Sequence, residues 1–83
     1  MTTLAVFRSR AQTLDFIAQL RSGGVPASAV NTPKEAGVGC GISAKFEESF
    51  LPRAQYYIKK KPYSSFAGFM RGSAGFFSYL PRG

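Results

Sequence analysis

The stretch that decides the fold is Thr3–Gly24, TLAVFRSRAQTLDFIAQLRSGG, in which a short apolar run leads directly into a helical pattern. Thr3–Phe7 is apolar and is followed by charge, which predicts a strand. Ser9 and Gln12 have the spacing of a capping box, in which a hydroxyl and an amide side chain satisfy free backbone groups at a helix start. The chain is therefore expected to open with a strand followed by a helix.

The predicted helix has an apolar face and a clear end. Gly23-Gly24 marks the end, because glycine adopts the left-handed cap conformation at little cost. Helical spacing predicts that the buried face consists of Ala11, Leu14, Ile17 and Ala18. Phe16 and Leu20 flank this face.

The rest of the chain continues the alternation of strands and helices. The predicted elements are a weak strand at Ala27–Asn31, a strand at Gly41–Phe46, a helix from Ser49 to Lys61 before Pro62, and a strand at Ser64–Arg71. The order is β-α-β-β-α-β, which a ferredoxin-like α+β domain satisfies most simply. That domain has a four-stranded antiparallel sheet with both helices on one face. We expect it to span residues 1–71, with an aromatic C-terminal tail at 72–83.

One face of the predicted sheet is left without helices. If Leu4, Ile42 and Phe66 point at the helices, the open face carries Phe7, Lys45 and Phe69. With the aromatic tail added, that is more apolar surface than a small monomer usually exposes. We therefore expect a homodimer through the sheet face or the tail.

Composition excludes several classes of protein. The 83 residues include one Cys and no His, so an internal disulfide, a zinc finger and a catalytic triad are all excluded. We expect a non-enzyme with no cofactor. The uncharged stretches are about half a membrane span, and the N-terminus lacks a basic leader, so a cytoplasmic protein is predicted.

The charge balance leaves a second class of partner open. Lys and Arg total 11 against 4 Asp and Glu, a net charge of +7. A basic ferredoxin-like domain can bind RNA through aromatic side chains on its sheet, so an RNA-binding module is an alternative function. A non-catalytic interaction subunit with a structural cysteine is another.

The single cysteine lies in a distinctive setting. Thr32-Pro33-Lys34-Glu35 reads as a capped turn, and Cys40-Gly41 follows five positions after Glu35, ahead of the apolar strand. This pattern resembles a family of small bacterial proteins described as putative selenium/sulfur carrier-like proteins, over about residues 3–71. The resemblance implies that Cys40 holds a persulfide or selenide that a sulfur- or selenium-donating enzyme supplies.

Such a carrier needs a reachable thiolate. Gly39 and Gly41 remove side chains on both sides of Cys40, while Lys34, Lys45 and Arg8 could favour the anion, and Thr32 could shape the loop. A structural role remains the alternative. Cys40 shares the parity of the apolar strand positions, and free cysteine is among the most buried residue types.

Overall fold

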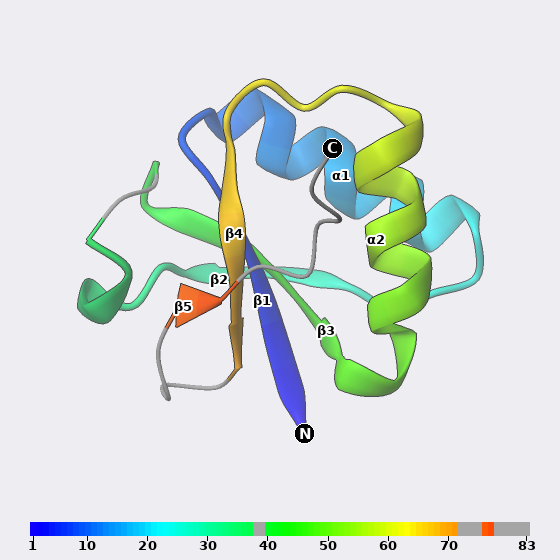
Figure 1. Ribbon diagram of the computed structural model, residues 1–83, viewed down its shortest axis with the longest axis horizontal. Coiled ribbons are helices and arrows are strands. Elements are labelled where there is room, and N and C mark those ends of the chain that lie inside the picture. The colour runs from blue at the N-terminus through cyan, green and yellow to red at the C-terminus, as the bar shows by residue number, and fades with distance from the viewer. Residues whose placement is uncertain (38–39, 72–75, 78–83) are drawn as a thin grey trace.

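The computed structural model describes residues 1–37, 40–71 and 76–77 and shows one sheet with two α-helices (Figure 1). The elements in chain order are β1 (Thr2–Phe7), α1 (Arg10–Ser22), β2 (Ser28–Asn31), the 3₁₀ turn η1 (Lys34–Ala36), β3 (Ile42–Glu47), the 3₁₀ turn η2 (Glu48–Phe50), α2 (Leu51–Lys60), β4 (Phe66–Arg71) and β5 (Phe76–Phe77).

The sheet topology confirms the ferredoxin-like α+β class. The strand order is β2-β3-β1-β4-β5, and each neighbouring pair is antiparallel. β3 lies between β1 and β2, and β1 lies between β3 and β4, so each β-α-β unit is split by a strand of the other. The sheet is wider than predicted, because Phe76–Phe77 of the tail pairs with Phe69 and Met70 as a fifth strand. The rest of the tail lies outside the described residues.

The start of α1 is capped as predicted, but only by half of the capping box. The Ser9 hydroxyl accepts a hydrogen bond from the Gln12 amide at 3.2 Å. The Gln12 side chain does not return to Ser9. Its Oε1 instead accepts from the amide and the hydroxyl of Ser65, at 2.9 and 2.7 Å. Gln12 therefore fastens the beginning of α1 to the segment that precedes β4.

The buried face of α1 differs from the predicted one. Thr13, Phe16, Ile17 and Leu20 are buried, whereas Ala11 and Ala18 are exposed and Leu14 is 48% exposed. The helix is rotated so that its largest apolar side chains meet the sheet. Burial of Phe or Leu contributes about 1.5–3 kcal/mol, and an alanine contributes much less. Size therefore decides between two faces that have similar periodicity.

Part of the predicted assignment of the sheet faces is wrong, although Phe66 packs against the helix-side core as predicted. Phe7 and Phe69 are fully buried and pack in the core beneath the helices, not on the open face. Leu4 and Val6 point to the other side, whereas Lys45 lies on the open face as predicted, opposite Leu4. Every residue of Leu4–Phe7 is apolar, so alternation alone does not select a face, and the bulky Phe7 packs with Phe16 and Tyr63 in the main core.

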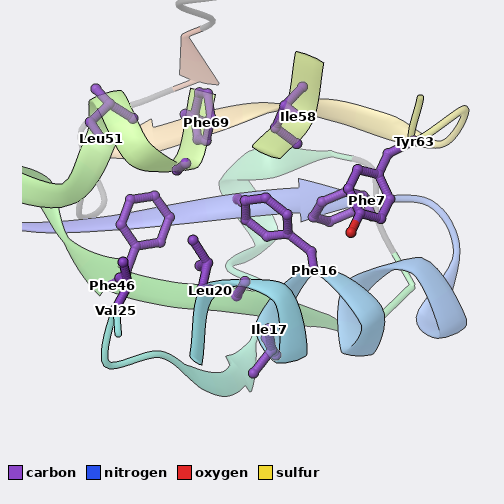
Figure 2. Packing of buried hydrophobic residues seen from close by; sticks show 13 residues of the cluster. Phe7, Phe16, Ile17, Leu20, Val25, Phe46, Leu51, Ile58, Tyr63 and Phe69 are labelled. Atoms are coloured by element: carbon purple, nitrogen blue, oxygen red, sulfur yellow. The ribbon is translucent and has the colours of Figure 1, made fainter. Parts of the chain in front are cut away.

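Aromatic rings fill the space between the sheet and the helices (Figure 2). The Phe7 ring lies 5.2 Å from that of Phe16 and 5.4 Å from that of Tyr63, and Phe16 and Tyr63 are 5.6 Å apart. These tilted and edge-on contacts add to the burial of apolar area. This cluster joins β1 and α1 to the segment after α2.

A smaller apolar cluster lies on the opposite face of the sheet. Leu4, Val6 and Met70 are buried there together with Ala36 from η1. The homodimer predicted through the sheet face therefore loses Phe7 and Phe69, two of the residues on which that prediction rested.

The second helix follows its predicted stripe but not its predicted cap. Leu51, Ala54 and Ile58 are buried against the core. Ser49 is exposed within η2 and caps nothing, because α2 begins at Leu51 after Phe50 without a side-chain cap.

The end of α1 packs closely on α2. A Cβ atom on Gly23 would lie 1.9 Å from the Tyr57 hydroxyl oxygen, so a larger residue at this crossing would displace the end of the Tyr57 side chain. Arg53 adds a hydrogen bond from its guanidinium to the Gly23 carbonyl at 2.9 Å. Both helices are therefore held on the same face of the sheet.

Candidate thiol site

The candidate site is built on the connection between β2 and β3. The Thr32 amide donates to the Gly41 carbonyl at 3.0 Å and closes the base of this loop. Gly41 has a φ of 99°, in the left-handed region that favours glycine. The chain therefore turns into β3 immediately after Cys40, and a Cys-Gly pair suits this corner for a conformational reason.

Cys40 lies next to the first turn of α1. Its Sγ is 3.5 Å from the Thr13 hydroxyl and 3.5 Å from the Ile42 carbonyl oxygen, to which the thiol donates. The cysteine is half-buried. Both sequence-based expectations for Cys40 are thus partly met: the side chain turns toward the helices, as strand parity predicts, yet it stays partly accessible.

Thr13 is the polar side chain that contacts the Cys40 sulfur. It is fully buried, and its amide and hydroxyl both donate to the Ser9 carbonyl at 3.0 Å. The thiol has one proton, which it donates either to the Ile42 carbonyl or to the Thr13 hydroxyl, and that hydroxyl can accept it while donating to the Ser9 carbonyl. If the thiol ionises, the Thr13 hydroxyl can turn its proton toward the sulfur, because the Thr13 amide still donates a hydrogen bond to the Ser9 carbonyl.

The surroundings of Cys40 favour its anion. Burial acts to raise the pKa of the thiol, but hydrogen bonding to the backbone of Ile42 and to Thr13, together with the charge of Arg10, lowers it below its ordinary value. A thiol with a lowered pKa is more nucleophilic at neutral pH, because more of it is present as thiolate.

The structure spreads the predicted site residues over a larger area than expected. Thr32 and Gly41 meet at the base of the loop, whereas Gly39 lies outside the described residues. Lys34 is exposed in η1, and Lys45 is exposed on the open face of the sheet, away from the α1 side on which Cys40 contacts Thr13.

The N-terminal end of α1 lies at the level of the cysteine. Arg8 is exposed and directly follows β1, whose Val6 pairs with Ser43 of β3. Figure 1 shows the β1–α1 turn at the same end of the sheet as the start of β3.

Thr32 does not have its predicted capping role. The residue at the N-cap of η1 is Pro33, which makes no side-chain cap. The Thr32 hydroxyl instead forms a 2.7 Å hydrogen bond with the hydroxyl of Ser43, which is fully buried on β3. Thr32 therefore joins the two strands at the base of the cysteine loop.

Sequence reasoning missed the two residues of α1 that act on the thiol, Thr13 and Arg10. Both lie about 30 positions before Cys40, and a threonine in a helix ordinarily signals nothing. One available signal was the polar Thr13 on the buried side of an otherwise apolar helix face, because buried hydroxyls are nearly always hydrogen-bonded.

A metal-binding cluster and a membrane-spanning helix are both absent from the described part of the chain. Residues 1–37, 40–71 and 76–77 contain no group of three or more His, Cys, Asp and Glu side chains that could hold a metal ion. Neither described helix is long and apolar enough to cross a membrane.

Comparison with known proteins gives a family for the chain. Neither the curated proteins nor the solved structures include a match. The model of the family described as "Putative Se/S carrier protein-like" matches residues 2–65, which include both α-helices, the cysteine loop and the first three strands. The chain therefore belongs to the Se/S carrier protein-like family.

Proposed function

We propose that this protein carries a sulfur or selenium atom on Cys40, as a persulfide or a selenide, between a donating enzyme and an acceptor. Membership of the carrier-like family supports a carrier role. The observation that supports Cys40 as the carrying residue is its half-buried thiol, which contacts Thr13. Burial acts to raise the pKa of this thiol, but hydrogen bonding to the backbone and to Thr13, together with the charge of Arg10, lowers it below its ordinary value.

The transfer is a thiol exchange that needs no oxidant. The Cys40 thiolate attacks the outer sulfur of a persulfide on the donor, a new S–S bond forms, and the donor's S–S bond breaks. The electron pair of the broken bond leaves on the donor sulfur as a thiolate, and Cys40 becomes Cys40–S–SH. With selenium as the outer atom the same exchange forms an S–Se bond.

The composition of the chain suits storage of the atom. Cys40 is the one cysteine among 83 residues, so no second thiol of the same chain can attack the persulfide and release its sulfur. The protein acts as a carrier and not as a catalyst, in the cytoplasm, where thiols are kept reduced.

RNA binding through the sheet receives no support from the described side chains. Phe7, Phe46 and Phe69 are buried on the helix side of the sheet, where bases cannot stack on them. We therefore retain only the carrier role.

The test has two stages. Native protein should be alkylated at Cys40 by iodoacetamide without unfolding, because the thiol is partly exposed and its pKa is lowered. Incubation with a cysteine persulfide or with selenide bound to a low-molecular-weight thiol should then add one sulfur or one selenium atom to the protein mass. Cys40→Ser is the control, and it should gain neither atom. Protection of Cys40 until global unfolding would show that the cysteine is structural and would refute the proposal.

A further inference from the structure

Positive charge lies at the end of the sheet that holds Cys40. Arg8 and Arg10 are both exposed, at the turn between β1 and α1. Three of the four carboxylates of the chain are engaged elsewhere: Asp15 with Lys61, Glu47 with the N-terminus and Glu48 with Arg71. None of these three carboxylates neutralises the two arginines.

Arg10 lies near the thiol, and Arg8 lies two residues before Arg10 in the chain. Arg10 acts electrostatically on Cys40, and Thr13, which contacts the sulfur, is three residues further along α1. Arg8 lies in the turn between β1 and α1, which Figure 1 shows at the same end of the sheet as the start of β3. A negatively charged molecule that approaches this end of the sheet meets the positive charge of Arg10 and, two residues before it, of Arg8.

We propose that Arg8 and Arg10 form a docking surface for an acidic protein surface, so that the protein exchanging sulfur with Cys40 presents its own sulfur among carboxylates. This inference rests on the proposed carrier function and adds the kind of partner. Guanidinium groups bind carboxylates with charge-assisted hydrogen bonds, and complementary charge accelerates encounter.

The chemistry of transfer favours a protein as the occupant over RNA. Sulfur must arrive on a thiol, which a protein supplies and RNA does not. The aromatic side chains at this end of the sheet also pack inward: Phe7 is fully buried and Phe66 packs against the core. The surface thus offers charge without a described ring on which a base could stack.

The first measurement is independent of sulfur transfer. Anionic iodoacetate and neutral iodoacetamide should be compared as reagents for native Cys40, because their rate ratio reports the local field. The double variant Arg8→Gln/Arg10→Gln should lower the iodoacetate-to-iodoacetamide ratio about fivefold at low salt. Lys59→Gln/Lys60→Gln, two exposed lysines at the end of α2, is the matched control and should leave the ratio unchanged.

The second measurement tests the occupant. A short Glu-rich peptide without cysteine should slow the alkylation of Cys40 by iodoacetamide about tenfold at low salt, and about 0.5 M KCl should abolish the protection. A Gln-rich peptide of the same length should give no protection, and neither peptide should protect the arginine variant.

Several outcomes would overturn the docking surface. These are protection by the Glu-rich peptide that persists in the arginine variant, no protection at all, or stronger protection by a single-stranded oligonucleotide. A failure of the carrier function shows differently: persulfides then add no sulfur to wild-type Cys40, whatever the peptides and the two alkylating reagents do.

Discussion

Helix α1 holds two titratable groups in contrasting ways. The carboxylate of Asp15 accepts hydrogen bonds from Lys61 at 2.7 Å and from the Tyr63 hydroxyl at 2.6 Å. The sulfur of Cys40 lies 3.5 Å from each of its two partners, Thr13 and Ile42. Asp15 and Thr13 are only two residues apart, so one helix carries a tight ionic contact and a loose thiol contact side by side.

The difference separates a structural group from a reactive one. The pKa of Asp15 is lowered by hydrogen bonds from Lys61 and Tyr63, and burial and the Asp15 contact raise the pKa of Tyr63. These bonds fasten α1 to the segment after α2. A sulfur that exchanges atoms must instead leave its partners easily, and long contacts to a hydroxyl and a carbonyl permit that. The following predictions test this division.

The largest effect is expected from Tyr63→Ala, which breaks the structural side of the comparison. Tyr63 is 8% exposed and packs on Phe7 and Phe16. Its truncation should cost about 3 kcal/mol or more in the free energy of unfolding, as loss of a core aromatic does. Urea denaturation followed by fluorescence measures this cost.

The conservative variant separates the ring from the hydroxyl. Tyr63→Phe keeps the ring and should lose about 1 kcal/mol, the value of one hydrogen bond to a partly exposed carboxylate. Equal losses in the two variants would show that packing of the ring contributes nothing. In both variants the alkylation rate of folded protein at Cys40 should match wild type.

The second effect concerns acid stability. Because the folded pKa of Asp15 is lowered from 3.8, its stabilisation is present above that value and is lost as the pH falls through the folded pKa. Asp15→Asn should therefore lower the stability at pH 7 by about 1 kcal/mol or less, since the pair is largely exposed.

At strongly acidic pH the two proteins should converge. Urea midpoints of wild type and Asp15→Asn, measured from neutral to strongly acidic pH, check this. A difference that stays constant over the whole range would show that the ionic contact with Lys61 contributes no stability.

The sequence predicted the order of the elements better than the direction of their side chains. The capping signal at Ser9 and the Gly23-Gly24 stop depend on local chemistry, and both define α1 in the structure. Which face of β1 or α1 is buried depends on the volume that the other elements leave. Leu4–Phe7 is apolar on both sides, and so the choice of Phe7 over Leu4 for the main core lies in tertiary packing.

The candidate site shows the same limit. Cys40 and its Gly41 corner could be selected from the sequence, because a left-handed turn favours glycine. Thr13 and Arg10 could not, since their approach to the sulfur depends on how α1 crosses the sheet. The closing of the loop by Thr32 and Ser43 likewise depends on the register of β2 against β3, which a weak strand pattern does not fix.

A smaller effect on stability is expected at the base of the cysteine loop. Thr32→Ala removes the partner of the buried Ser43 hydroxyl and should cost about 1 kcal/mol in the free energy of unfolding. Thr32→Ser keeps the hydroxyl and should recover most of that loss. A loss of stability in Thr32→Ser as large as in Thr32→Ala would show that the hydroxyl pair is not the cause.

The smallest effect on stability, and the sharpest test of the reactive side, is expected from Thr13. Thr13→Val keeps the shape of the side chain and removes the hydroxyl that hydrogen-bonds to Cys40, so the pKa of the thiol should rise. The alkylation rate at neutral pH should fall about threefold, because less of the thiol is ionised. Thr13→Ser should restore the rate.

Above the pKa of the thiol the three proteins should react alike, since the cysteine is then thiolate in all of them. A rate in Thr13→Val that is lower by the same factor at every pH would mean that Thr13 controls access to the sulfur, and equal rates at neutral pH would mean that the contact does not favour the thiolate.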